Sequence, residues 1–483
     1  MYLNAASKKT ALIARKRQTK RGESLNSTSA TAPAGIAAPT ETWPSVARSW
    51  YAVFVFAIVL MFAFIDRQII TLLVGPIKKD LGVSDTQMSM LLGFAFVMFY
   101  VVLGIPIARL ADVKSRRLII GIGIAVWSAM TAACGLAQNY WQLFAARIGV
   151  GVGEACNGPA TFSMLSDYFP REKLAKAAAV LSIGFFIGSG IALIVGGQVV
   201  QLVSGMPDIA VPLIGTIHSW QVAFIAVGLP GLFIAALIRT VEEPRRRGLI
   251  APLPGAPVQK ARALPIRDIF RYLFDDWKSY GPMYAGMGLR SMVAFGASAW
   301  LPTFFIRTYG WTAPQVGMAL GVILLTISPL GLLAGGFLAE WYAKKGYADA
   351  NMRVNLISTI AILPTSMLYP LMPTPELAIV LFAANSFLAS IGPGPANAAL
   401  QTITPNQMRA QVTALYLFVF NLIGYGVGPV TVALITDYIF QSESALRYSL
   451  AINAAVLGPI AWLIFWYGLK PYRESYIRAV ARG

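Results

Sequence analysis

Charged side chains are scarce in this chain of 483 residues. Asp, Glu, Lys and Arg make up 12% of the sequence, which is about half of their usual share in soluble domains. The chain has one histidine and two cysteines, and Cys134 and Cys156 both lie in apolar stretches. This composition excludes a disulfide framework and a zinc site. Because no P-loop, catalytic triad, CxxC or HExxH pattern occurs, we expect neither an enzyme nor a bound cofactor.

Apolar residues, in contrast, make up 57% of the chain and gather in long uninterrupted runs. The runs are roughly 20 residues long, enough for a helix to cross a hydrocarbon core of about 30 Å. No soluble core can bury a dozen of them, so the sequence predicts an all-α polytopic membrane protein with twelve transmembrane helices. The expected spans are 50–74, 86–110, 117–137, 140–166, 175–202, 219–240, 281–305, 314–340, 353–372, 376–402, 409–438 and 446–469.

The formal net charge of +18 is distributed unevenly. Most of the 39 Lys and Arg residues lie in the terminal segments, in the loops of one side or at span ends on that side. By the positive-inside rule, both termini are then cytoplasmic. Residues 1–49 form a basic leader rich in Ser, Thr, Ala and Pro, which cannot build a core. We expect this disordered leader to contact the anionic membrane surface rather than nucleic acid, and it lacks the apolar stretch of a signal peptide.

A single long connection, residues 241–280, divides the spans into two sets of six. The predicted domains are therefore a bundle at 50–240, the cytoplasmic linker at 241–280, a second bundle at 281–469 and a cytoplasmic tail at 470–483. The linker contains a helical pattern of apolar residues at i, i+3, i+4, i+7 and i+8 spacing, which predicts an amphipathic helix at the membrane interface. These apolar residues are Ile266, Ile269, Phe270, Leu273 and Phe274.

The two halves share short sequence signatures in the same order. "ARLADVKSRR" (108–117) matches "GFLAEWYAKK" (336–345), and "NGPATF" (157–162) matches "PGPANA" (393–398). "IGSG" in the fifth span likewise matches "IGYG" in the eleventh. Each match is weak alone, but three matches in order predict a duplicated six-helix unit.

These signatures resemble the major facilitator superfamily, whose two six-helix halves are related in this way. "RIGVGVGEACNGP" (147–159) resembles the fourth-helix motif of that family, whereas the glycine–proline pair expected near the end of the fifth span is missing. Within the superfamily the chain resembles the spinster branch, through "DRQI" in the first span, "GEACNGPA" in the fourth and "GVSDTQMSML" (82–91).

The resemblance implies two pseudo-symmetric bundles that expose a central site to each side of the membrane in turn. Spinster-like proteins are associated with moving lysophospholipids or sphingosine phosphates, often coupled to protons. We therefore expect a multi-pass protein of the bacterial inner membrane that acts as a monomer, with the proton as its coupling ion.

Charged residues inside the spans are the candidates for that coupling. At 1.5 Å per residue, Asp66 and Arg147 both lie about 10 Å from the external ends of their helices, so they can pair across a cavity between helices 1 and 4. Glu154 lies on the same face as Arg147 and deeper. We expect these three residues to relay protons, although a permanent ion pair between the helices is the alternative. Arg67 points about 100° away from Asp66, and it is expected either to brace a neighbouring helix or to bind substrate.

In the second half, Arg290 is the ionised residue that lies deep in a span. Its guanidinium suits an anionic headgroup, and the alternative is a contact with the acids of the first half or with helix-end carbonyls. Four further residues are expected to line the apolar part of the substrate site, namely Tyr284, Trp300, Asn385 and Asn421. The repeated loop motifs are expected to act as gates, through Asp112, Arg116, Arg117, Glu340, Lys344 and Lys345.

The leading hypothesis is a proton-coupled secondary transporter of an amphipathic organic anion, such as a lysophospholipid or a sphingoid-type lipid. A proton symporter for uptake of a small aromatic or carboxylic acid is the alternative within transport, because such substrates need less apolar wall. An alternative of another class is a transport-inactive receptor or scaffold that recruits partners through the basic leader. That class predicts neutral replacements at the charged positions, whereas Asp66, Arg147 and Glu154 are all present.

Overall fold

The computed structural model describes residues 43–212, 215–246, 266–405 and 407–481. Most of the expected leader, the part of the linker at 247–265 and the last two residues of the tail lie outside the described residues. Helices account for nearly all of the described chain, as the apolar runs predict. We call the described residues up to 246 the N-half and those from 266 onward the C-half.

The N-half consists of the first six spans and a small hairpin. Its helices are α2 (Val46–Leu72), α3 (Val74–Leu81), α4 (Asp85–Ser89), the π-helical segment η1 (Met90–Phe94), α5 (Ala95–Val113), α6 (Arg116–Cys134), α7 (Tyr140–Glu154), α8 (Asn157–Tyr168), α9 (Arg171–Ser204) and α10 (Ser219–Leu237). The antiparallel strands β1 (Ile209–Val211) and β2 (Gly215–Ile217) pair between α9 and α10.

The C-half begins with a short helix and continues with six spans. Its helices are α11 (Ile266–Asp275), α12 (Trp277–Tyr309), α13 (Ala313–Lys344), α14 (Ala350–Leu368), α15 (Pro375–Ile391), α16 (Pro393–Ile403), α17 (Arg409–Asn421), the π-helical segment η4 (Leu422–Val427), α18 (Gly428–Leu434), the π-helical segment η5 (Ile435–Phe440) and α19 (Leu446–Ala481). Helix α11 lies where the sequence predicts an amphipathic helix in the linker.

Two of the expected spans are broken near their middle by proline. Within the described residues, eleven helices are long and apolar enough to cross a membrane, and the fourth expected span is divided into α7 and α8. Pro159 has no N–H for the carbonyl of Ala155 and its ring clashes there, so α7 ends at Glu154. In the tenth span, Pro395 acts in the same way on Ile391, where α15 ends. The repeated "GPA" sequence therefore marks equivalent helix breaks in the two halves.

The two halves approach closely where glycines replace side chains. A Cβ atom on Gly317 of α13 would lie 2.2 Å from the Leu193 carbonyl oxygen of α9. A Cβ atom on Gly93 of η1 would lie 1.8 Å from the Tyr425 carbonyl oxygen of η4. Small residues thus allow backbone-to-backbone packing between the halves, as is typical of membrane helices.

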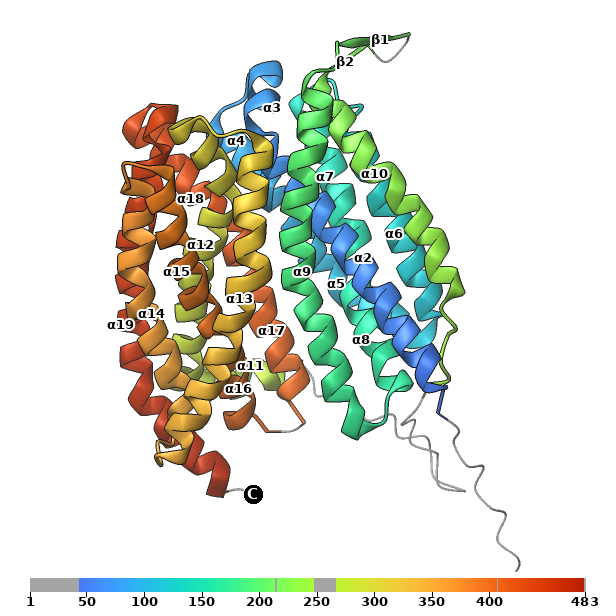
Figure 1. Cartoon of the computed structure of the whole chain (residues 1–483). Coiled ribbons are helices and arrows are strands. Elements are labelled where there is room, and N and C mark those ends of the chain that lie inside the picture. The colour runs from blue at the N-terminus through green and yellow to red at the C-terminus, as the bar shows by residue number, and fades with distance from the viewer. Residues whose placement is uncertain (1–42, 213–214, 247–265, 406, 482–483) are drawn as a thin grey trace, which may run out of the picture. The chain divides into compact units, whose positions relative to one another are not determined.

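The spans run between two distinguishable ends (Figure 1). We call the end with β1, β2, α3 and α4 the hairpin end, and the end with α11, α16 and the C-terminus the linker end.

Trp300, which the sequence assigned to the substrate site, is fully buried in a hydrophobic cluster that contains residues of both halves. This position is that of a core residue.

Candidate functional site

An ion pair at the break in the fourth span joins two spans of the N-half. The guanidinium of Arg67 on α2 donates a hydrogen bond to the carboxylate of Glu154, the last residue of α7. The side chain of Glu154 is 2% exposed and that of Arg67 is 17% exposed. Arg67 therefore braces a neighbouring helix, which is one of the two roles expected for it.

Arg147 makes different contacts from those expected. It is fully buried and donates to two main-chain carbonyls, that of Leu91 at 3.3 Å and that of Asp66 at 3.4 Å. Arg147 and Asp66 are neighbours, but the side-chain ion pair that the sequence predicts between them is not formed. The depth of a residue in its span predicts its neighbours, whereas the direction of a long arginine side chain depends on the carbonyl groups around it.

The carboxylate of Asp66 is buried and forms no hydrogen bond of normal geometry among the described residues. Its side chain is 1% exposed, and neither of its oxygens has a hydrogen-bond partner among the described residues. Two side chains of α6, Trp127 and Thr131, face it, and their polar atoms are also unpartnered among the described residues. An ionised carboxylate without partners in such an environment is far more costly than a neutral carboxyl group.

Aromatic rings surround the guanidinium of Arg67. Its central carbon lies 4.4 Å from the ring centroid of Phe96, 5.3 Å from that of Phe64 and 5.6 Å from that of Tyr100. The fourth ring, at 5.9 Å, belongs to Tyr425 of the C-half. These distances are within the range of cation–π attraction. A residue of the C-half, Tyr425, therefore contacts the Arg67–Glu154 pair directly.

Sequence reasoning missed Tyr425, although a signal was available. The residue is the tyrosine of "IGYG", the repeat of "IGSG", and it stacks on Phe295 with ring centroids 3.7 Å apart. It also lies in η4, whose backbone touches η1 at Gly93. Segments of π-helix within α-helices are frequent at functional sites, but the irregularity cannot be predicted from apolar periodicity.

Arg290 is fully engaged by the protein. It donates to the hydroxyls of Ser358 at 2.7 Å and Thr359 at 3.2 Å, and to the carbonyls of Leu388 at 3.3 Å and Ala389 at 3.0 Å. The two carbonyls belong to the last turn of α15, whose end is left without helical partners by the break. The contacts of Arg290 therefore match the expected alternative, a contact with helix-end carbonyls. They do not match a guanidinium that is free for an anionic headgroup.

This contact predicts that Arg290→Ala lowers stability. Each buried carbonyl that loses its donor costs about 1–3 kcal/mol, so we expect a clear fall in the melting temperature of the detergent-solubilised protein. Arg290→Lys is expected to recover part of it, because an ammonium donates hydrogen bonds but lacks the planar fork. An unchanged melting temperature together with lost substrate binding would instead assign Arg290 to the headgroup.

The other expected lining residues mainly use their polar groups within the protein. Trp300 donates to the Pro429 carbonyl at 3.0 Å, and the Tyr284 hydroxyl donates to the Val412 carbonyl at 2.8 Å. Asn385 accepts a hydrogen bond from Ser366 at 2.6 Å. The partly exposed Asn421 donates to the carbonyl of Leu417 in its own helix.

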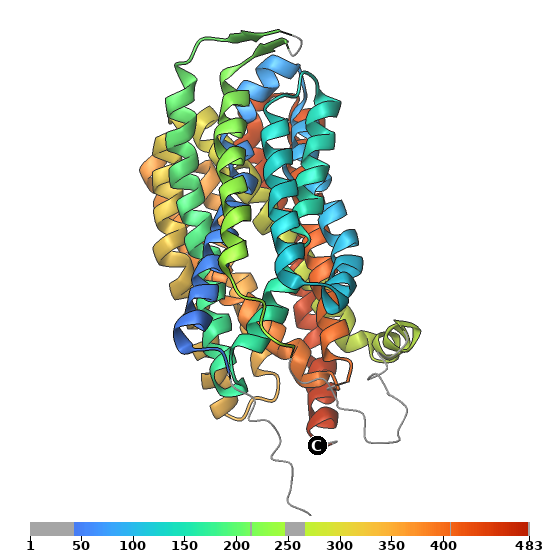
Figure 2. The ribbon, with the colours of Figure 1, turned by 90° about the vertical axis from the view of Figure 1, so that its right-hand side faces the viewer.

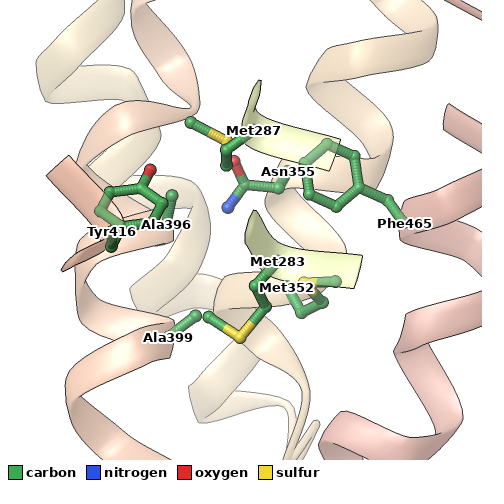
Figure 3. Close-up of a pocket in the computed structure, with 8 residues that line it drawn as sticks. All are labelled: Met283, Met287, Met352, Asn355, Ala396, Ala399, Tyr416 and Phe465. Atoms are coloured by element: carbon green, nitrogen blue, oxygen red, sulfur yellow. The ribbon is translucent and has the colours of Figure 1, made fainter. Parts of the chain in front are cut away.

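A small cavity lies among the helices of the C-half (Figure 3). Its volume is about 10 Å³, enough for roughly one water molecule. The side chain of Asn355 borders it, and the Oδ1 atom of this residue has no partner among the described residues. The cavity is too small for an organic substrate.

A larger hollow of about 400 Å³ lies at the linker end, lined by Gln401, Arg409, Thr413, Ala414 and Leu417.

At the hairpin end, ion pairs join the two halves. Asp85, the aspartate of "GVSDTQMSML", is fully buried and accepts from both terminal nitrogens of Arg307, at 2.7 and 2.9 Å. Lys78 contacts Asp85 and lies 2.8 Å from Glu443. The Asp437 carboxylate accepts from the Thr86 hydroxyl at 2.7 Å. Acids and bases from both halves therefore hold this end together.

We predict that Asp85→Asn opens the hairpin end. A hydrogen bond between charged groups contributes about 1.5–3 kcal/mol, so its loss should raise the open population by about tenfold or more. Spin labels at Lys79 and Ser444, both exposed and in opposite halves, report the separation by electron–electron double resonance. Asp208→Asn is the matched control, because it makes the same chemical change at the same end, and Asp208 is 58% exposed and contacts only His218 of its own half in the ion pairs of this end. An identical distance distribution in Asp85→Asn and the wild type would show that this network does not hold the end closed.

The repeated loop motifs at the linker end make contacts within their own halves. Arg116 is 1% exposed and pairs with Asp167 and with Glu243, the latter at 3.1 Å. Arg117 donates to the Val241 carbonyl at 3.3 Å. The side chain of Asp112 is outside the described residues. In the C-half, Glu340 pairs with Lys344 in the same helix at 2.6 Å, and Lys345 lies over the Trp341 ring.

Glu243 caps α6 and gives this region a pH dependence. Burial opposes its ionisation, but hydrogen bonds from the Ser115 hydroxyl and from the backbone N–H groups of Arg117 and Arg116 hold the pKa of Glu243 below its ordinary value of 4.5. A lowered pKa means that the ionised group stabilises the fold above pH 4.5 and that this stabilisation is lost as the pH falls through the folded-state value.

We therefore expect Glu243→Gln to lower the melting temperature at neutral pH. The difference from the wild type should stay constant down to about pH 5 and shrink below that, as the wild-type carboxylate takes up its proton. Melting curves of both proteins between pH 3 and 8 measure this difference. A difference that is independent of pH would contradict an ionised cap.

Comparisons with known proteins agree with this architecture. The family model described as Major Facilitator Superfamily matches residues 56–429. An MFS-type efflux pump of Mycolicibacterium smegmatis is 28% identical over 89% of this chain and 95% of that protein. A probable L-galactonate transporter of Escherichia coli is 24% identical over 83% of this chain and 85% of that protein.

A solved structure shows the same fold. It is the crystal structure of a bacterial homolog to the human lysosomal transporter spinster, in an inward-facing and unoccupied conformation. The TM-score is 0.71 at 22% sequence identity, and the match covers 91% of this chain and 99% of that chain.

Proposed function

Because the chain belongs to the Major Facilitator Superfamily, we propose that it is a proton-coupled secondary transporter of an amphipathic organic anion. The observation that carries the proposal is the buried carboxylate of Asp66 beside the Arg67–Glu154 pair. Protonation and release of Asp66 once in each cycle is the proposed coupling event, with Glu154 and Arg147 as the neighbouring acid and base.

The charges of this centre explain how a proton and an anion become linked. With all four groups ionised, Asp66 and Glu154 balance Arg67 and Arg147. A proton on Asp66 leaves one positive charge in a region of low dielectric, where an anion is attracted far more strongly than in water. Binding of the proton and the anion is therefore mutually favourable, as linkage requires.

The proposed orientation places the linker end in the cytoplasm. It is supported by the basic residues of the leader and of the linker-end loops, since Lys and Arg concentrate on the cytoplasmic side. A cysteine introduced at Ser24 that is labelled by an impermeant reagent outside intact cells would contradict this orientation. In this orientation, the ion pairs around Asp85 close the external side.

In the same orientation, we propose that the structure represents an inward-facing state of the cycle. Arg116, Glu340 and Lys344 pair within their own halves at the cytoplasmic side, as expected of released gates. Alternating access then requires the hairpin-end network to break while Tyr425 moves relative to Arg67. Tyr425 is therefore proposed to couple the movement of the halves to the charged centre.

The substrate is proposed to be a lysophospholipid or a sphingoid-type lipid. The hollow at the linker end supports an amphipathic anion, because it combines Arg409 with the apolar side chains of Ala414 and Leu417. The protein is proposed to act as a monomer in the bacterial inner membrane, without a cofactor.

Uptake of a small carboxylic acid is the second candidate function. It is favoured by the likeness to a probable L-galactonate transporter, whose named substrate is a carboxylate. Thermal-shift screening of the purified protein against lysophospholipids, sphingoid phosphates, sugar acids and aromatic acids separates the two candidates. Stabilisation by lysolipids alone supports the leading proposal, and stabilisation by sugar acids alone overturns it.

A further inference from the structure

Helix α11 leaves part of its apolar side uncovered. Ile269 is 3% exposed and packs against the C-half, and the Tyr272 hydroxyl donates to the Ile403 carbonyl at 3.2 Å. Phe270 and Phe274, however, are 43% and 72% exposed. The helix is thus attached to the bundle on one side and presents two aromatic rings on the other.

Cationic side chains lie next to these rings. At about 100° per residue, Phe270 and Phe274 are neighbours on the helix surface, and Arg267 and Arg271 follow them around the helix. Both arginines are exposed. The carboxylates of Asp268 and Asp275 lie beyond the arginines, on the side away from the rings. An apolar strip bordered by positive charge is the pattern of a helix that lies in a membrane interface.

The position of α11 makes this strip continuous with the outside of the bundle. Figure 2 shows α11 projecting sideways from the bundle at the linker end. Asp276, which joins α11 to α12, accepts from the Ser475 hydroxyl at 2.6 Å and from Arg478 at 3.1 Å. The next residue, Trp277, begins α12 and is 52% exposed. Exposed aromatic residues therefore lie both on α11 and at the first residue of a membrane span.

We propose that α11 is a binding site for anionic lipids at the linker end. Phe270, Phe274 and Trp277 enter the boundary between headgroups and acyl chains, where aromatic residues concentrate. Arg267 and Arg271 bind the lipid phosphates, which their planar guanidinium groups match in geometry. The bilayer is the favoured occupant because charge and apolar surface are both matched, and the inference is independent of the substrate and of proton coupling.

Spin labels test the lipid contact in the full-length protein. In a Cys134→Ala/Cys156→Ala background, a nitroxide at Phe274→Cys is compared with one at Asp275→Cys, reconstituted in phosphatidylcholine vesicles that contain one quarter phosphatidylglycerol. We expect oxygen, which dissolves in lipid, to relax the label at 274, and an aqueous nickel chelate to relax the label at 275. Equal access of the nickel chelate to both labels would overturn the proposal. A label at 274 shielded from both reagents would also overturn it, because a protein would then cover the strip.

The role of the arginines is tested by native mass spectrometry. Phosphatidylglycerol binding should weaken by about fivefold for each of Arg267→Gln and Arg271→Gln, since one cation near an anionic surface contributes roughly that factor. The control removes two exposed cations at the same end, the last residue of α13 and the residue after it, as Lys344→Gln/Lys345→Gln. Equal lipid binding by the arginine variants and the control would remove the headgroup site from α11.

Discussion

In Asp66→Asn, we expect accumulation of substrate driven by a pH gradient to disappear while downhill exchange partly survives. A gradient of one pH unit supplies about 1.4 kcal/mol for each proton, so one-to-one coupling allows about tenfold accumulation. Asparagine imitates the neutral carboxyl group at nearly constant volume but cannot release a proton. The variant should therefore bring substrate to equal concentrations on both sides of the membrane.

The measurement is uptake of labelled substrate into proteoliposomes, with and without an imposed pH gradient. Asp275→Asn is the matched control, because it makes the same chemical change at an exposed position outside the spans, and it should accumulate substrate like the wild type. Tenfold accumulation in Asp66→Asn would show that the carboxylate is architectural.

The second large effect concerns the Arg67–Glu154 pair. Arg67→Met leaves the carboxylate of Glu154 buried without its cation, and the loss of one partner of a buried pair costs about 3–5 kcal/mol. In Arg67→Met/Glu154→Leu both charges are gone, so most of the stability should return, because apolar residues of similar volume often replace buried pairs without loss. Transport should nevertheless remain absent in the double variant if the pair belongs to the proton pathway.

Thermal unfolding of the single and double variants gives the coupling energy between the two side chains. The control cycle uses Arg48 and Glu242, an exposed pair with 68% and 67% exposed side chains, whose removal should change stability by less than about 1 kcal/mol. A double variant that is both stable and active would assign the Arg67–Glu154 pair to helix packing alone.

The sequence predicts the helices and the neighbours of the charged residues, because these follow from apolar length and helical rise. The proximity of Asp66 and Arg147 is an example. The sequence does not predict the hydrogen-bond partners of these residues, because the long flexible side chains of Arg67 and Arg147 each have several acceptors within reach. Arg147 donates to two main-chain carbonyls. Arg67 pairs with the carboxylate of Glu154, which the sequence places with Arg147 in the proton relay.

The helix breaks and the contacts between the halves are harder to predict from the sequence. The repeated "GPA" sequence indicates duplication, and its prolines, Pro159 and Pro395, also explain where α7 and α15 end. The second break places Arg290 beside carbonyls that lack helical partners, and apolar periodicity does not predict this break. Tyr425 could not be assigned, because its contact with Arg67 depends on the packing of one half against the other.

The most direct test of the central claim follows the proton itself. Substrate is added to proteoliposomes that contain a pH-sensitive dye and no initial pH gradient, and proton movement is recorded for the wild type and for Asp66→Asn. We predict that substrate entry carries protons with it and changes the internal pH in the wild type, whereas in Asp66→Asn substrate enters down its own concentration gradient without a pH change. Equal proton movement in both proteins would contradict coupling through Asp66.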